Sequence, residues 1–90
     1  MRPVRSHVFR GKRWKVRYRK MADCHGLTDA PQEPGKEIWL DPRTDGIEHL
    51  STLLDEGIHC CQWDLDNEIV AEIATDLARW LWRMGYRRQG

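Results

Sequence analysis

The run Asp55-Glu56-Gly57-Ile58-His59 has the spacing of an HExxH helix, with aspartate in place of the first histidine. Side chains four residues apart on an α-helix project from the same side, so Asp55 and His59 could hold one divalent ion. Glu56 occupies the position from which the glutamate of an HExxH helix takes the proton of a metal-bound water. The motif therefore predicts metal-dependent hydrolysis, with Asp55 and His59 as metal ligands and Glu56 as the catalytic residue.

A third protein ligand is expected from the helix that follows, where Glu68, Glu72 and Asp76 form one acidic row. Glu72 is the predicted ligand, because Glu72 and Asp76 have the ExxxD form in which a glutamate binds the metal and the aspartate orients a ligating histidine. Glu68 or Asp76 could take the place of Glu72. The alternative is a solvated acidic row without a metal, with Asp76 paired to Arg79.

Aspartate at position 55 changes the metal chemistry that the motif can support. A carboxylate is harder, shorter and more negative than an imidazole, so a ligand set of Asp55, His59 and Glu72 is less selective for zinc. Two carboxylates also neutralise more of the ion's charge, which makes its bound water less acidic. We expect a divalent metal cofactor, zinc first with manganese or iron as alternatives. The other interpretation is a degenerate site that has kept its fold and lost its metal.

The segment from Leu53 to Tyr86 resembles the C-terminal half of small uncharacterised HExxH proteins of bacteriophages and bacteria, which are similar to minimal gluzincin metallopeptidases. The preceding sequence PGKEIWLDP matches the strand and loop before their metal helix. The resemblance implies a zincin-like fold and a peptide or protein substrate. It also implies that Ile38, Trp39 and Leu40 form the edge strand along which an extended peptide lies.

The 90 residues predict a single α+β domain, in which a small three-stranded, mostly antiparallel sheet is followed by two packed helices. Trp14, Val16 and Tyr18 alternate with basic residues, as in a strand with one buried face. Pro, Gly and Asp are frequent before the next strand and predict a loop. The expected elements are a basic hairpin (1–20), a loop (21–36), an edge strand (37–41), a metal-site helix (45–63) and a C-terminal helix (66–86).

The metal-site helix carries an apolar stripe that is expected to pack on the sheet. Its members are Ile47, Leu50, Leu54, Ile58 and Cys61. Because Cys61 belongs to this stripe, it is expected to be a core residue, and its neighbour Cys60 is expected to be only partly buried.

Charge is distributed unevenly along the chain. Residues 1–20 contain nine Lys or Arg residues and no acid, although the net charge of the whole chain is only +1. Four basic side chains alternate along the second strand: Arg13, Lys15, Arg17 and Arg19. The alternative function is therefore an inactive zincin-fold module that binds nucleic acid or an acidic protein partner through these strands.

Three cysteines, two of them adjacent, and the lack of a signal-peptide pattern at the N-terminus predict a cytoplasmic protein with reduced thiols. No apolar run approaches the length of a transmembrane helix, so no membrane partner is expected. The chain is expected to be a monomer or a homodimer, with Trp82 as a candidate interface residue.

Overall fold

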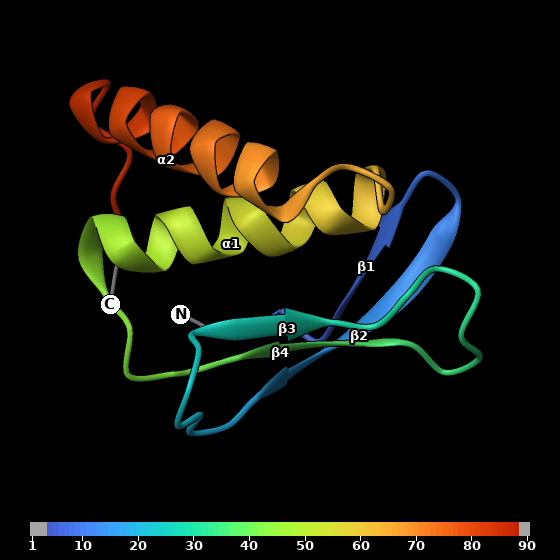
Figure 1. Ribbon diagram of the computed structural model, residues 1–90. Helices are drawn as coiled ribbons and strands as arrows, with labels where there is room; N and C mark the ends of the chain where they lie inside the picture. The colour runs from blue at the N-terminus through green and yellow to red at the C-terminus, as the bar shows by residue number, and fades with distance from the viewer. Residues whose placement is uncertain (1–3, 89–90) are drawn as a thin grey trace.

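The computed structural model describes residues 4–88, in which two helices are layered on one face of a four-stranded mixed sheet (Figure 1). The strand order is β1-β2-β4-β3, and β2 and β4 run parallel while the two outer pairs are antiparallel. The α+β class is confirmed, and the predicted number of strands is wrong by one. The elements are β1 (Ser6–Phe9), β2 (Lys12–Tyr18), β3 (Gly26–Thr28), β4 (Glu37–Leu40), α1 (Gly46–Cys61) and α2 (Asn67–Arg83).

The β1–β2 hairpin turns at Arg10 and Gly11, whose φ angles of 49° and 81° are both positive. Positive φ at both central residues gives a two-residue turn whose twist matches that of the flanking strands, and glycine adopts this conformation without strain. The register pairs Phe9 with Lys12 and His7 with Trp14. Phe9 and Trp14 consequently face the helices, and Trp14 is fully buried with Ile38 and Leu40.

β4 is not the edge strand that the sequence predicts. It pairs with β2 on one side and with β3 on the other, so Ile38, Trp39 and Leu40 belong to the interior of the sheet. β3 lies in the segment predicted as a loop. The sequence does not predict this strand, because the three residues Gly-Leu-Thr are too few to show an alternating pattern. The edges of the sheet within residues 4–88 are β1 and β3.

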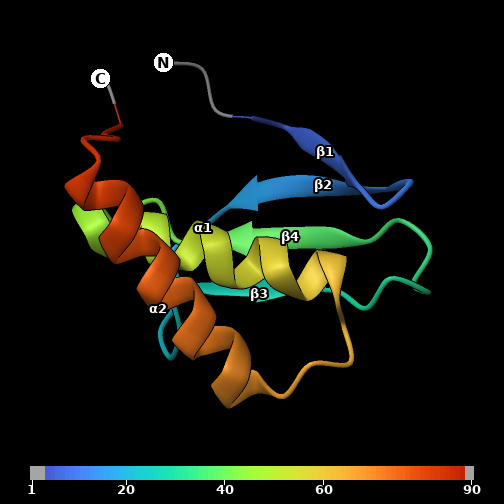
Figure 2. The ribbon, with the colours of Figure 1, turned by 90° about the horizontal axis from the view of Figure 1, so that it is seen from above.

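α1 lies between the sheet and α2, and therefore has two packed sides (Figures 1 and 2). Its buried residues are His49, Glu56 and Cys60. Cys60 belongs to the core cluster, whereas Cys61 is exposed, so the predicted roles of these two cysteines are reversed. The predicted apolar stripe does not pack wholly on the sheet, because Ile47 lines a surface depression together with Thr75 and Ala78 of α2.

α2 begins with Asp66, whose side chain accepts a hydrogen bond of 2.8 Å from the backbone N–H of Glu68. This bond satisfies one of the free N–H groups at the start of the helix. α2 buries Val70, Ala74 and Ala78, which are small enough for the two helices to approach closely. Neither helix in residues 4–88 combines the length and the apolar composition needed to cross a membrane.

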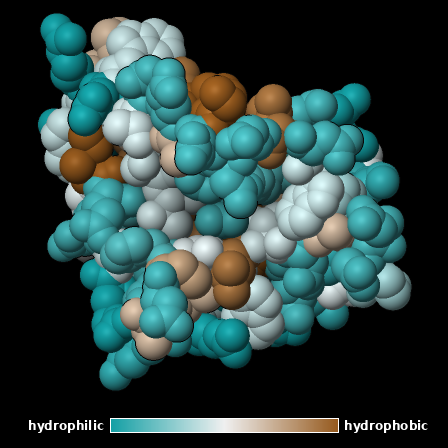
Figure 3. All heavy atoms as spheres, viewed as in Figure 1, coloured by the Kyte–Doolittle hydropathy of each residue, from teal (hydrophilic) through white to brown (hydrophobic). Residues whose placement is uncertain are grey.

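Seen from above, α1 lies over β4 and β3, α2 runs obliquely past the β3 side of the sheet, and the β1–β2 hairpin extends beyond the helices on the other side (Figure 2). Apolar side chains also reach the surface over the helix layer, amid a mostly polar face (Figure 3). They include a row on the outer side of α2: Ile69, Ile73, Leu77, Trp80 and Met84. Trp80, not the predicted Trp82, is the outward-facing tryptophan of this helix, because Trp82 is half-buried.

Candidate functional site

Asp55 and His59 meet on α1 as the motif predicts. The Oδ1 atom of Asp55 lies 3.2 Å from the Nε2 atom of His59, and both side chains are partly buried. Two donors of a tetrahedral zinc ion, each about 2.1 Å from the metal, are roughly 3.4 Å apart. The separation of these two atoms therefore suits joint ligation of one ion. The same contact is an i,i+4 ion pair when His59 is protonated.

Glu56 is turned from this pair toward the sheet, where β3 holds its carboxyl group. Thr28 Oγ1 donates a hydrogen bond of 2.7 Å to Glu56 Oε1. A Cβ atom on Gly26 would lie 2.9 Å from Glu56 Oε2, so the absence of a side chain at Gly26 makes room for the second oxygen. Only 8% of the Glu56 surface is exposed. β3 is thus the element that fixes the predicted catalytic carboxylate.

The surroundings of Glu56 favour its protonated form. Burial raises the pKa of Glu56, and the negative charge of Asp55 raises it further. The hydrogen bond from Thr28 and the positive charge on protonated His59 act in the opposite direction. Burial is the largest effect, so Glu56 keeps its proton to a higher pH than an exposed glutamate does. A raised pKa suits a group that takes up and returns a proton near neutral pH.

The predicted third ligand does not join the pair on α1. Glu72 is exposed, and it lies two residues, about 200° of helix rotation, from both Val70 and Ala74 on the side of α2 that packs against α1. Glu68 and Asp76 are exposed as well. Among residues 4–88, no three His, Cys, Asp or Glu side chains are grouped so that they could hold a metal ion. The acidic row of α2 faces solvent, and the ion pairs found among residues 4–88 do not include the expected pair of Asp76 with Arg79.

The cysteines do not add a ligand to the pair. Cys60 points into the core, and burial raises the pKa of its thiol to about 12, so the thiolate needed for ligation is disfavoured. All three cysteines are free thiols. His25, next to Cys24, instead lies 3.2 Å from Glu48 on the exposed surface.

Three basic residues of β2, together with Arg19 just after its end, share the face of the sheet that the helices leave open. Arg13, Lys15, Arg17 and Arg19 are all exposed, since they alternate with the inward-facing Trp14, Val16 and Tyr18. The Arg19 guanidinium lies 4.4 Å from the centre of the Trp39 ring. Arg17 forms an ion pair with Glu37. This outer face therefore combines positive charge with an aromatic ring.

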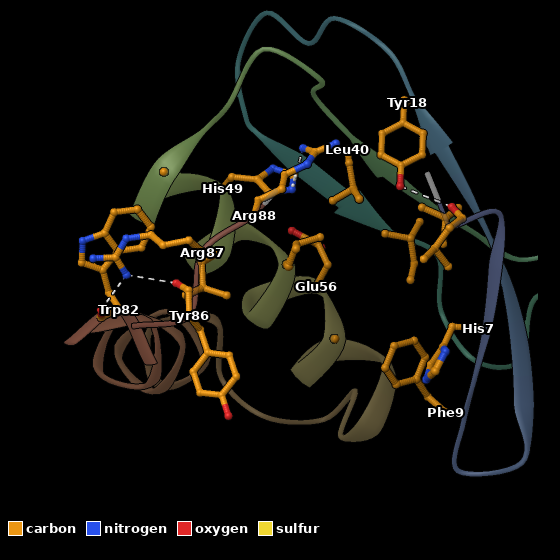
Figure 4. Close-up of a pocket in the computed structure, with 17 residues that line it drawn as sticks. His7, Phe9, Tyr18, Leu40, His49, Glu56, Trp82, Tyr86, Arg87 and Arg88 are labelled. Carbon is orange, nitrogen blue, oxygen red and sulfur yellow. Dashed lines mark hydrogen bonds between the residues drawn. The ribbon is translucent and has the colours of Figure 1, made fainter. Parts of the chain in front are cut away.

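Sequence reasoning missed a cavity of about 490 Å³ between α1 and the strands β1, β2 and β4 (Figure 4). Most of its wall is apolar, and Glu56 is the acidic residue in its lining. Its lining also includes the buried His49 and the exposed Arg87 and Arg88. The sequence gives little indication of this cavity, because its lining comes from five separate segments. No local sequence pattern shows that the helices leave part of the hairpin uncovered.

No protein-family model, curated protein or solved structure matches this chain.

Proposed function

We propose that this chain is a metal-dependent hydrolase of the minimal zincin-like type, with a variant Asp/His metal site. The observation that carries the proposal is the close approach of Asp55 and His59 on α1, in the same helix turn as the Glu56 that β3 holds. Glu56 is bonded to Thr28 of β3, and His59 is only about 60° of helix rotation from Glu56. The donor atoms of Asp55 and His59 have the separation of two ligands of one ion.

The free edge of β3 is the proposed site for an extended peptide substrate. Within residues 4–88, β3 pairs with β4 alone, so its second edge has backbone groups available for a further strand. A peptide added there gains backbone hydrogen bonds, which give affinity without fixing its sequence. The peptide backbone would then pass close to Glu56. β3 replaces Ile38, Trp39 and Leu40 as the proposed substrate strand.

In this proposal Asp55 and His59 hold the ion, with zinc as the expected metal. When bound, the metal supplies a Lewis acid that activates water at neutral pH. Glu56 would accept the proton of that water and pass it to the leaving group. Because Thr28 occupies Oε1, Oε2 is the oxygen proposed to exchange the proton. The buried position of Glu56 keeps its pKa above the ordinary value and so matches this task.

The test is the metal content of protein purified without chelator or histidine tag, measured by plasma mass spectrometry. We expect near-stoichiometric metal in the wild type and its loss in His59→Ala. His25→Ala is the matched control, because His25 lies on the exposed surface and pairs with Glu48. Glu56→Gln should keep the metal and lose peptide hydrolysis. A wild-type protein free of metal would overturn the proposal.

The basic outer face supports a second candidate, the binding of single-stranded nucleic acid. Basic side chains that follow a strand can contact successive phosphates, and an exposed aromatic ring can stack on a base. Trp39, which is partly exposed beside Arg19, provides such a ring. Binding of a labelled oligonucleotide should weaken steeply with salt and weaken further in the Arg13→Gln, Lys15→Gln double variant. A salt-independent affinity would exclude this candidate.

A further inference from the structure

The cavity between α1 and the hairpin side of the sheet has the dimensions of a small-molecule site. Its volume of about 490 Å³ falls within the range of roughly 300–1,000 Å³ typical of ligand pockets. Its apolar wall includes Phe9 of β1, Val16 of β2, Leu40 of β4, and Leu50 and Leu53 of α1. Asp55 and His59 do not belong to its lining, so it is separate from the proposed metal ligands.

The positive charge of the cavity is concentrated at its rim, in the segment that follows α2. Arg87 stacks on Trp82 with its guanidinium carbon 3.5 Å from the ring centre, and its Nη1 donates to the carbonyl oxygens of Trp82 and Tyr86. Arg88 Nη1 donates to His49 Nε2 at 3.2 Å. An arginine carries five N–H donors in a planar fork that matches a carboxylate. Each guanidinium thus has donors beyond the bonds described.

A buried chain of hydrogen bonds holds Arg88 in this position. Burial and the charge of Arg88 lower the pKa of His49, so its imidazole is neutral and Nε2 can accept from Arg88. Nδ1 then carries the hydrogen and donates to Thr44 Oγ1 at 3.0 Å. The Thr44 hydroxyl donates in turn to the backbone oxygen of Asp41 at 3.0 Å. Arg88 is therefore anchored through His49 of α1 (Figure 4) and Thr44 to the residue that follows β4.

We propose that this cavity binds a free amphipathic anion, namely an apolar chain that ends in a carboxylate, as in a fatty acid. The chain would lie between α1 and the sheet, and the carboxylate would lie on Arg87 and Arg88. Charge fixes this orientation, because Arg87 and Arg88 attract a carboxylate, whereas most of the remaining wall is apolar. A ligand with a cationic head would meet the arginines at the entrance and is disfavoured.

The test is calorimetric titration of the full chain with dodecanoate below its micellar concentration, compared with dodecanol and dodecylamine of the same chain length. We expect dodecanoate to bind most tightly and dodecylamine most weakly. Arg88→Gln should weaken dodecanoate binding by about tenfold or more, the effect of losing a hydrogen bond between charged groups. Arg13→Gln removes an equal charge from the outer face of the sheet and should leave this affinity unchanged.

A second variant separates the apolar contribution from the charge. Leu53 lines the cavity and is partly exposed, so Leu53→Trp should fill the space and reduce dodecanoate binding without unfolding the chain. Equal affinity for the three ligands, or an unchanged affinity in Arg88→Gln, would overturn the proposal. Binding to anionic phospholipid vesicles but not to monomeric dodecanoate would also overturn it, in favour of a membrane surface. None of these variants alters Asp55 or His59, so the result is independent of the metal measurement.

Discussion

Thr28 Oγ1 donates a hydrogen bond of 2.7 Å to Glu56 Oε1 and thereby joins the edge strand β3 to the middle of α1. The bond has two consequences. It gives the buried Glu56 carboxyl group a hydrogen-bond partner. It also lowers the pKa of Glu56, although burial raises this pKa by a larger amount. A three-residue strand thus lowers the pKa of the residue proposed to transfer the proton.

Thr28→Val tests this relationship, because valine keeps the shape of threonine and removes the donor. We expect the pKa of Glu56 to rise further, since the bond stabilises the charged form more than the neutral form. Leaving a buried carboxyl oxygen without its donor should also cost about 1–3 kcal/mol of unfolding free energy. Titration of the Glu56 carboxyl carbon by NMR measures the first effect, and urea unfolding measures the second. An unchanged pKa would show that the bond does not form in solution.

The raised pKa of Glu56 predicts how stability depends on pH. The ordinary value of 4.5 applies to the unfolded chain, and the folded chain binds the proton more tightly. The folded state then holds more protons between the two pKa values, so the unfolding free energy falls as pH rises from 4.5 through the folded pKa. Glu56→Gln should remove this part of the pH dependence. Urea unfolding of both proteins across this interval checks the sign, and a rise in stability attributable to Glu56 would contradict it.

Two glycines near this contact should respond to alanine with opposite signs. At Gly26 the added Cβ would lie 2.9 Å from Glu56 Oε2 and 3.1 Å from Thr52 Cγ2, so Gly26→Ala should destabilise the fold by about 1–3 kcal/mol. At Gly57, inside α1, the nearest atom is 3.7 Å away on Phe9, which is an ordinary contact. Gly57→Ala should therefore stabilise α1 by roughly 0.5–1 kcal/mol. Thermal unfolding of both variants provides the comparison.

The tryptophans offer a similar pair of contrasting substitutions. Trp14 is 0% exposed and donates from Nε1 to the carbonyl oxygen of Asp29, so Trp14→Ala should cost about 3–5 kcal/mol. That loss is a large part of the stability of a small domain. Trp80 is 58% exposed, and Trp80→Ala should change the unfolding free energy by about 0.5 kcal/mol or less. Equal effects of the two substitutions on urea unfolding would contradict the assignment of the core.

Much of the fold follows from local sequence patterns. The alternation of Trp14, Val16 and Tyr18 predicts an inward face of β2, and the expected helices 45–63 and 66–86 correspond to α1 and α2. β3 could not be foreseen, because a strand of three residues acquires its structure from pairing with β4. Without β3, the strand β4 has no partner on that side, and it is therefore predicted as an edge strand.

The candidate site, like the fold, can be predicted from the sequence only in part. The i,i+4 spacing of Asp55 and His59 is a property of one helix, so the sequence is sufficient to bring them together. The position of Glu72 depends on the rotation of α2 against α1, which Val70, Ala74 and Ala78 determine by close packing. The cavity depends on how far the helices extend over the sheet. Neither of these relationships between elements is encoded in a local pattern.

Asp55→His restores the HExxH pattern and tests whether aspartate is what limits the site. Two imidazoles one helical turn apart bind zinc more selectively than an aspartate and an imidazole do, and they leave more positive charge on the ion. We expect tighter zinc binding and faster peptide hydrolysis than in the wild type. Asp55→Asn is the matched control, because it keeps the size of the side chain, removes its charge and should weaken metal binding. Competition with a zinc chelator measures the affinities. If Asp55→His gains no affinity for zinc, α1 does not hold its ligands in a geometry that suits the metal, and the hydrolase proposal fails with it.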